Sequence, residues 1–114
     1  MNLVTGAAGH LGNVLVRELL DRGEQVRVLI LPGEDTRSLK GLPVDCVIGN
    51  VLDPESLSCA MRDVDTVCHL AALVSITEDK AHLLQAVNVD GTRNVIAAAK
   101  AARVRKLVYT SSIH

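Results

Sequence analysis

Aromatic residues are almost missing from this sequence, which has no tryptophan, no phenylalanine and a single tyrosine, Tyr109. Hydrophobic residues nevertheless make up 48% of the 114 positions, so a core must be built from valine, leucine, isoleucine and alanine. Aliphatic runs of this kind are typical of a sheet that helices cover on both faces. The length suffices for one domain with its own core, spanning residues 1–114.

An excess of charge and a pattern of paired cysteines are missing as well. The formal net charge is −1, which excludes the basic surface that binding to nucleic acid requires. The cysteines are odd in number and form no CxxC pair, so neither a metal site nor a disulfide framework is indicated. We expect Cys46, Cys59 and Cys68 to be buried, reduced thiols of a cytoplasmic protein. No apolar run is long enough to span a membrane, and no segment has the pattern of a signal peptide.

Strand-like and helix-like segments alternate along the whole chain. Strands are expected at residues 2–5, 25–31, 44–48, 66–70 and 106–110, helices at 10–22, 53–62 and 79–102, and one helical turn at 36–40. Asp53 and Pro54 have the residue types of a helix N-cap and first position, and Gly23 follows the first helix where a glycine commonly ends one. This alternation predicts an α/β fold with a doubly wound parallel sheet in the order 3-2-1-4-5.

A glycine-spaced turn, TGAAGHLG at residues 5–12, joins the first strand to the first helix. Such a turn brings backbone N–H groups and a helix N-terminus against a phosphate. In this arrangement Gly6 allows the tight turn, Gly9 lets the backbone approach the ligand, and Gly12 lets helix and strand pack closely. The turn therefore predicts a dinucleotide site at the centre of the sheet.

Four further blocks accompany the turn in a fixed order: GNVLD at 49–53, HLAA at 69–72, NVDGTRNV at 88–95 and VYTSS at 108–112. With these blocks the chain resembles the N-terminal, cofactor-binding part of an extended short-chain dehydrogenase/reductase of the NAD(P)-dependent epimerase/dehydratase group. The resemblance implies a Rossmann-type sheet, NAD or NADP as cofactor and a small-molecule substrate. It also implies a homodimer, because the long helix at 79–102 often contributes to a four-helix interface in this family.

The resemblance assigns roles to particular residues. Asn50 and Val51 would contact the adenine, Ala71 and Ala72 would let the backbone lie against the cofactor, and Asn88 would hold the central strands and the cofactor edge. Ser112 matches the catalytic serine that hydrogen-bonds the reacting oxygen of the substrate, with Ser111 as the nearby alternative. The full set of implied cofactor-binding residues is Gly6, Ala8, Gly9, His10, Leu11, Gly12, Leu31, Asn50, Val51, Leu70, Ala71, Ala72, Asn88 and Thr110. Gly91 would allow close packing of helix on sheet, and His69 is expected to be a packed histidine at a strand end.

Cofactor preference is normally decided just after the second strand, where an acid binds the ribose 2′-hydroxyl or an arginine accommodates a 2′-phosphate. Ile30 and Leu31 occupy those positions and give neither signal. Asp35 and Arg37, slightly downstream, favour opposite answers, so the choice between NAD and NADP stays open.

The Tyr-x-x-x-Lys pair that moves the proton in this family is missing, because Tyr109 has no lysine at the required spacing. We therefore expect the chain to be a portion of a longer enzyme, with the substrate region lying elsewhere. Its sheet would be incomplete on the side of the fifth strand. An unpaired edge strand predicts a chain that is weakly stable alone or that associates through that strand.

Two functions follow from this pattern. The first is the cofactor-binding part of an epimerase, dehydratase or reductase acting on a hydroxyl or keto carbon, with nucleotide sugars as the commonest substrates and sterol-like or flavonoid-like ketones as others. The second is a non-catalytic NAD(P)-binding sensor or regulatory module. A P-loop protein is disfavoured because the sequence has no GxxxxGK[ST].

Overall fold

The computed structural model of the chain describes residues 1–7, 9–71 and 78–111, with the side chains of 10, 71, 78–88, 110 and 111 outside that description. It contains five parallel strands in the order β3-β2-β1-β4-β5. The strands are β1 (Asn2–Thr5), β2 (Val26–Ile30), β3 (Asp45–Ile48), β4 (Thr66–Ala71) and β5 (Lys106–Ser111). The predicted α/β class and strand order are confirmed.

The helices are α1 (His10–Asp21), α2 (Pro54–Ala60) and α3 (Glu78–Ala101), with a 3-10 turn, η1 (Arg37–Leu39), between β2 and β3. Every element lies within two residues of its predicted bounds. Asp53 caps α2 as expected, since its side chain accepts a hydrogen bond from the Glu55 N–H, and Pro54 stands at the first helical position. Gly23, with φ +78°, follows α1 in the left-handed conformation that ends many helices.

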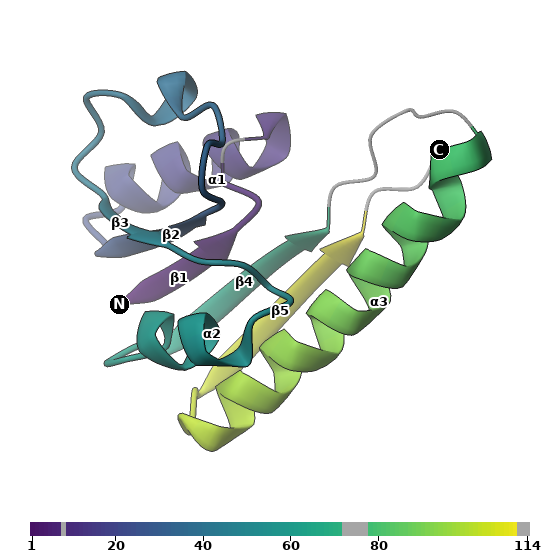
Figure 1. Ribbon diagram of the computed structural model, residues 1–114. Coiled ribbons are helices and arrows are strands. Elements are labelled where there is room, and N and C mark those ends of the chain that lie inside the picture. Colours follow the sequence, from purple (N-terminus) through teal and green to yellow (C-terminus); the bar gives the residue numbers. More distant parts are fainter. Residues whose placement is uncertain (8, 72–77, 112–114) are drawn as a thin grey trace.

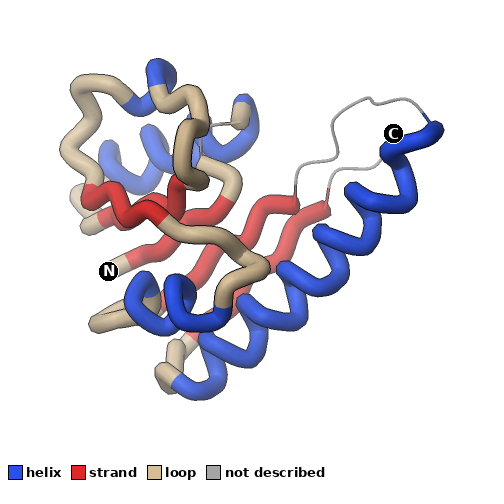
Figure 2. The backbone as a smooth tube through the Cα atoms, viewed as in Figure 1, coloured by secondary structure: helices blue, strands red, loops and turns tan. Residues whose placement is uncertain are grey.

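The sheet separates two layers of helix. Figure 1 shows α2 and α3 together on the near face of the sheet and α1 on the far face. The tube in Figure 2 shows the strands lying side by side between them. One core cluster, which includes Leu3, Leu57 and Val95, joins β1 to α2 and α3, and a second, which includes Val4, Val16 and Val28, joins the sheet to α1. The predicted aliphatic core is confirmed, with Met61 as an additional buried residue.

The expectation for the cysteines is wrong at two of three positions. Cys68 is buried in β4, but Cys46 and Cys59 are exposed. Cys46 belongs to β3, an edge strand of the described sheet. Only β2 pairs with β3 among the described residues, and most side chains of β3 are exposed. Cys59 lies on the outer side of α2, whose buried residues are Leu57 and Ala60.

The last described strand, β5, pairs only with β4 among the described residues. Leu107, Val108 and Tyr109 along it are 36%, 37% and 52% exposed. These apolar surfaces agree with the expected open side of the sheet, while the expected weak stability of the chain remains a prediction. Within the described ranges, no helix has both the length and the apolar character needed to cross a membrane.

Candidate cofactor site

The first glycine of the turn is required by the fold itself. Gly6 has φ +72°, in the left-handed region that side chains rarely adopt. A Cβ added there would lie 2.5 Å from the carbonyl oxygen of Leu70, because the turn passes directly over the end of β4. The backbone of Gly6 therefore packs directly against the backbone of Leu70, at the carboxyl edge of the central strands.

The third glycine is required by helix packing. A Cβ on Gly12 would lie 2.7 Å from the Cα of Ala7, so α1 can approach the turn this closely only with glycine at that position. This is the role that the spacing predicts for Gly12. Gly12 is buried, in agreement with that contact.

Gly9, in contrast, is not required by any packing within the described part of the chain. It is exposed, has φ −74°, and an added Cβ would meet only the Gly6 carbonyl oxygen, at an ordinary 3.4 Å. Its N–H donates to that same oxygen at 3.2 Å and closes the turn. The fold thus leaves open space above Gly9, which a ligand can approach to backbone distance.

The N-terminus of α1 has no described side-chain cap. Gly9 is the N-cap residue, no described side chain accepts from the first turn, and that turn contains no acidic residue. The same chain caps α2 with Asp53 and places Glu55 in its first turn. The first N–H groups of a helix carry a partial positive charge and need acceptors. The N-terminus of α1 is therefore suited to binding an anion.

The ends of β2 and β3 continue the site beyond the turn. The register pairs Thr5 with Leu29 and Ile30 with Ile48, so Leu31 lies at the edge between the glycine turn and the segment after β3. Pairing extends one residue further, because the Gly49 N–H donates to the Ile30 carbonyl oxygen at 2.8 Å. A dinucleotide with its pyrophosphate at Gly9 would have to cross Leu31 to bring its adenine to Asn50 and Val51.

Val51 is held in place by α3. Gly91 is buried, and a Cβ added to it would lie 2.6 Å from Cγ2 of Val51. Three residues further along the helix, the Asn94 side chain donates from Nδ2 to the Val51 carbonyl oxygen at 2.9 Å. The predicted close packing at Gly91 is therefore present, and its partner is the loop after β3 rather than a strand.

Asn50 uses part of its side chain to shape the same loop. Its Oδ1 accepts from the Leu52 N–H at 2.9 Å, and its backbone N–H donates to Ser56 Oγ at 3.0 Å. The half-buried side chain keeps a second lone pair on Oδ1, and Nδ2 has no partner within the described part of the chain. An amide in this state can accept from the amino group of an adenine and donate to a ring nitrogen.

Below the turn, His69 ties three elements together. It is 6% exposed, and its Nδ1 lies 2.6 Å from Thr5 Oγ1 while its Nε2 lies 3.1 Å from Thr92 Oγ1 in α3. The Leu70 N–H also donates to Thr5 Oγ1, at 3.2 Å. Burial lowers the pKa of the His69 imidazole, so the ring is neutral at physiological pH.

Stacking against Tyr109 completes the surroundings of His69, with ring centroids 5.7 Å apart. The expectation of a packed histidine at the end of β4 is confirmed. Its two ring nitrogens are occupied by threonine hydroxyls, so the side chain positions β1, β4 and α3 relative to one another.

The segment after β2 is folded back on the strand end. Glu34 Oε1 accepts from the Leu31 N–H at 2.9 Å. Arg37 donates from Nε to both carboxylate oxygens of Asp35 and from Nη2 to Oδ2 at 2.8 Å. These bonds lower the pKa of the Asp35 carboxyl and raise that of the Arg37 guanidinium. Asn13 of α1 anchors the segment by donating to the Ser38 carbonyl oxygen at 2.7 Å.

Other predicted site residues lie in the first turn of α1 and at the ends of β4 and β5. Leu11 is 56% exposed in the first turn of α1, and Leu70 is half-buried beside Gly6. Thr110 pairs with Leu70, and Ser111 pairs with Ala71, at the carboxyl edge of β4 and β5. Ala8, Ala72 and Ser112 lie outside the described residues, as do the side chains of His10, Ala71, Asn88, Thr110 and Ser111.

Four contributors were not assigned from the sequence: Thr5, Glu34, Thr92 and Asn94. Thr5, Thr92 and Asn94 stand inside the quoted blocks, so their positions were visible but their partners were not. Glu34 lies outside all of the quoted sequence blocks. Its contact with the Leu31 N–H depends on the turn at Gly33, which has φ +79°.

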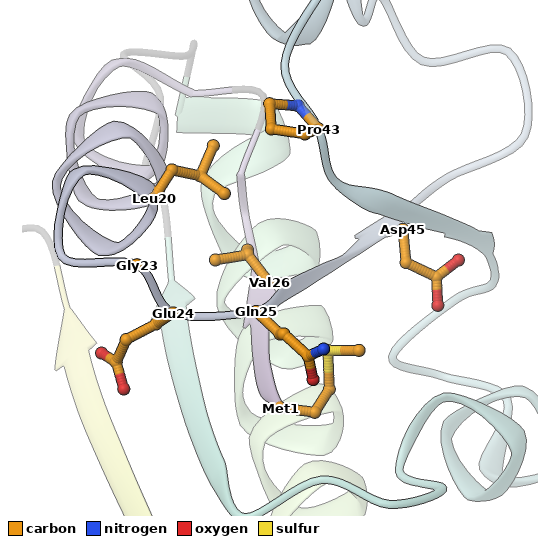
Figure 3. Close-up of a pocket in the computed structure, with 8 residues that line it drawn as sticks. All are labelled: Met1, Leu20, Gly23, Glu24, Gln25, Val26, Pro43 and Asp45. Carbon is orange, nitrogen blue, oxygen red and sulfur yellow. The ribbon is translucent and has the colours of Figure 1, made fainter.

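A hollow of about 400 Å³ lies at the opposite edge of the sheet, where the strands begin. Figure 3 shows Met1, Leu20, Gly23, Glu24, Gln25, Val26, Pro43 and Asp45 around it. Its position at the amino ends of β1, β2 and β3 separates it from the glycine turn by the length of the strands. No group of three or more potential metal ligands occurs within the described part of the chain.

Residues 3–114 match the sequence profile of the 3-beta hydroxysteroid dehydrogenase/isomerase family. Sterol demethylase protein B of Methylococcus capsulatus is 46% identical over 110 residues, which cover 96% of this chain and 34% of that protein. A short-chain dehydrogenase/reductase superfamily protein from Agrobacterium tumefaciens, solved with bound NAD, is 38% identical with a TM-score of 0.81 over 98% of this chain and 32% of its own.

The UDP-glucose 4-epimerase of Thermus thermophilus, solved in complex with NAD, is 32% identical with a TM-score of 0.80, over 93% of this chain and 35% of its own. The chain thus spans about a third of the length of these three proteins.

Proposed function

Because this chain belongs to the 3-beta hydroxysteroid dehydrogenase/isomerase family, among the extended short-chain dehydrogenase/reductases, we propose that it binds NAD or NADP for an oxidoreductase. The reaction type is that of an epimerase, dehydratase or reductase acting on a hydroxyl or keto carbon. Support comes from the NAD bound in the Agrobacterium and Thermus proteins, which share this fold and are over 30% identical in sequence.

The residues present fit a dinucleotide. The first N–H groups of the uncapped helix α1 would hold the pyrophosphate above the backbone of Gly9, and Leu11 would lie against it. Asn50 and Val51 would hold the adenine, with Val51 fixed from behind by α3. Leu70, Ala71, Ala72, Asn88 and Thr110 would line the nicotinamide half by the resemblance given above. When bound, the nicotinamide ring supplies hydride transfer to or from the substrate carbon.

Gly9 is the single observation that carries this proposal. The fold explains glycine at positions 6 and 12 by its own contacts, but nothing within the described residues requires glycine at position 9. A glycine that the fold does not need, in front of an uncapped helix, is accounted for by a ligand that must approach the backbone.

The test is a graded series at that position. Gly9→Ala and Gly9→Val should leave the melting temperature within a few degrees of the parent, because the space above Gly9 is open. NADH binding, followed by calorimetry or by the nicotinamide fluorescence, should weaken about tenfold or more in Gly9→Val. Gly12→Ala is the contrasting variant, expected to lower the melting temperature because it meets the Cα of Ala7. Unchanged NADH affinity in Gly9→Val would remove the loop from the site.

For the chemistry, we assign Ser112 as the hydroxyl that orients the reacting oxygen, with Ser111 as the alternative. The support is the place of β5, whose carboxyl end lies beside β4 at the edge where Gly6 contacts Leu70. In a longer protein that joins this chain to a Tyr-x-x-x-Lys pair, Ser112→Ala should leave NADH affinity unchanged and lower turnover, whereas a role in cofactor binding would change the affinity.

Two substrate classes are candidates, a sterol and a nucleotide sugar. The name of the Methylococcus relative refers to sterols, while the Thermus structure is an epimerase of a nucleotide sugar. In a longer protein that joins this chain to a Tyr-x-x-x-Lys pair, incubation with NAD and either a 3β-hydroxysteroid or UDP-glucose separates them by which one is converted. Tight NADH binding by a longer protein that has no such pair would favour the non-catalytic NAD(P)-binding module.

We also propose a homodimer formed through α3. Val89 and Ile96 are seven residues apart, lie on one side of the helix and are 46% and 37% exposed. Ile96→Glu should convert a dimer to a monomer in size-exclusion chromatography with light scattering. A cytoplasmic location is the accompanying proposal, supported by cysteines that are free thiols.

A further inference from the structure

The end of β2 lacks the acid or arginine that usually selects between NAD and NADP. Leu31 occupies the edge position between the glycine turn and the adenine segment. Its side chain has no group that binds a ribose hydroxyl. The structure nevertheless brings a carboxylate to this position, from three residues downstream.

Glu34 reaches back through the turn at Pro32-Gly33, and its Oε1 accepts from the Leu31 N–H at 2.9 Å. This bond holds the carboxylate beside the backbone that follows β2. Because β2 pairs with β1, this position neighbours Gly6 and Ala7, which follow β1. Adjacent strands are about 4.8 Å apart, so the carboxylate stands next to the route that a dinucleotide takes from Gly9 to Asn50.

The bond to Leu31 leaves most of the carboxylate available. An ionised carboxylate has about four lone-pair positions, of which one is used here. Oε2 has no partner within the described part of the chain, and the side chain is half-buried, so it is held without being covered. Such a group can accept from the ribose hydroxyls of the adenosine half.

We propose that Glu34 is the specificity-determining residue of this site and selects NAD(H) over NADP(H). This inference rests on the proposed function and deepens it. The carboxylate accepts from the 2′-hydroxyl of NAD, and it repels the 2′-phosphate of NADP because both groups are negative.

Arg37 is the residue that would favour the opposite choice. It is paired with Asp35 through hydrogen bonds from Nε and Nη2, and its side chain is 89% exposed. Solvent screens an ion pair this exposed, so the pair contributes little energy and does not by itself prevent Arg37 from turning to a phosphate. The charge fixed at the strand end, on Glu34, decides the preference.

The test uses ADP-ribose and 2′-phospho-ADP-ribose, two probes that differ only at the ribose position in question. Calorimetry on the folded chain should give about tenfold or greater preference for ADP-ribose. Glu34→Gln keeps the bond to the Leu31 N–H but removes the charge and replaces Oε2 with an NH2 group. It should therefore tighten 2′-phospho-ADP-ribose several-fold and weaken ADP-ribose, which loses its acceptor for the 2′-hydroxyl.

Glu24→Gln is the matched control. Glu24 is exposed and precedes the same strand at the opposite edge of the sheet, so this variant changes the net charge equally but should leave the preference unchanged. Equal affinity for the two probes, a preference for the phosphorylated one, or an unchanged ratio in Glu34→Gln would overturn the inference alone. Failure of both probes to bind the parent chain would instead overturn the proposed function with it.

Discussion

Thr5 and His69 are joined by a hydrogen bond of 2.6 Å that links the end of β1 to the end of β4 directly beneath the glycine turn. Thr5 Oγ1 also accepts from the Leu70 N–H, so this one hydroxyl joins two groups of β4. On its other side the imidazole contacts Thr92 Oγ1 in α3 through Nε2. One neutral histidine therefore links the three elements around Gly6.

Removal of the Thr5 hydroxyl should be costly. Thr5→Val keeps the shape but leaves two buried groups, His69 Nδ1 and the Leu70 N–H, without their partner. We expect the free energy of unfolding to fall by about 1–3 kcal/mol, measured by urea denaturation. Thr66→Val, at the half-exposed start of β4, is the control and should change stability by less than about 0.5 kcal/mol. Equal effects of the two variants would contradict the network.

Acidic pH should destabilise the fold through His69. Burial lowers the pKa of this imidazole from 6.5 in the native state, so the unfolded chain takes up the proton first as the pH falls. The stability is lost as the pH falls through 6.5, and the loss continues until the native group also protonates. Well above pH 6.5 the group contributes no pH dependence.

The measurement is the difference between two stability profiles, which isolates the contribution of His69. His69→Gln should show a smaller loss of unfolding free energy than the parent between pH 7 and pH 5 (about the range in which an unperturbed imidazole titrates). Parallel profiles would mean that His69 is not the group responsible.

Gly91→Ala should have two opposite effects on the stability of the fold. Alanine favours a helix interior by about 1 kcal/mol over glycine, but here its Cβ would lie 2.6 Å from Cγ2 of Val51. We expect net destabilisation and weaker binding of ADP-ribose, because the adenine loop must shift. In a Val51→Ala background the same change should become stabilising, since the obstructing methyl group is gone. Thermal unfolding of the parent, the two single variants and the double variant measures the coupling between the two positions.

Arg103→Gly should stabilise the chain. Arg103 follows α3 with φ +58°, a conformation that costs a side chain energy and a glycine none. The expected gain is about 0.5–1 kcal/mol in unfolding free energy. Arg105→Gly is the control, because Arg105 is equally exposed and has no left-handed backbone. A gain at both positions would point to a charge effect instead.

The order of the strands could be predicted because alternating strands and helices leave few ways to wind a parallel sheet. The separate duties of Gly6 and Gly12 followed from their spacing, and both are visible in the contacts of those residues. Contacts between distant segments could not be predicted, since nothing in the sequence near Gly91 reveals that Val51 will lie against it.

Exposure was the other property that the sequence did not reveal. Cys46 has apolar neighbours, Val47 and Ile48, and was expected in the core. It lies instead on a strand with a neighbour on only one side, where Ile48 is also 61% exposed. The contact of Glu34 cannot be predicted for a related reason, because it depends on a turn that reverses the chain and not on any pattern along the sequence.

The two exposed thiols, Cys46 and Cys59, have a practical consequence for every measurement of subunit number. Both are open to air oxidation, whereas burial raises the pKa of the Cys68 thiol and keeps it in the unreactive protonated form. Copies joined covalently through β3 or α2 would have the mass of a dimer but would not involve Ile96. A dimer formed through α3 persists in dithiothreitol and separates in Ile96→Glu, whereas a cross-linked one behaves in the opposite way in both respects.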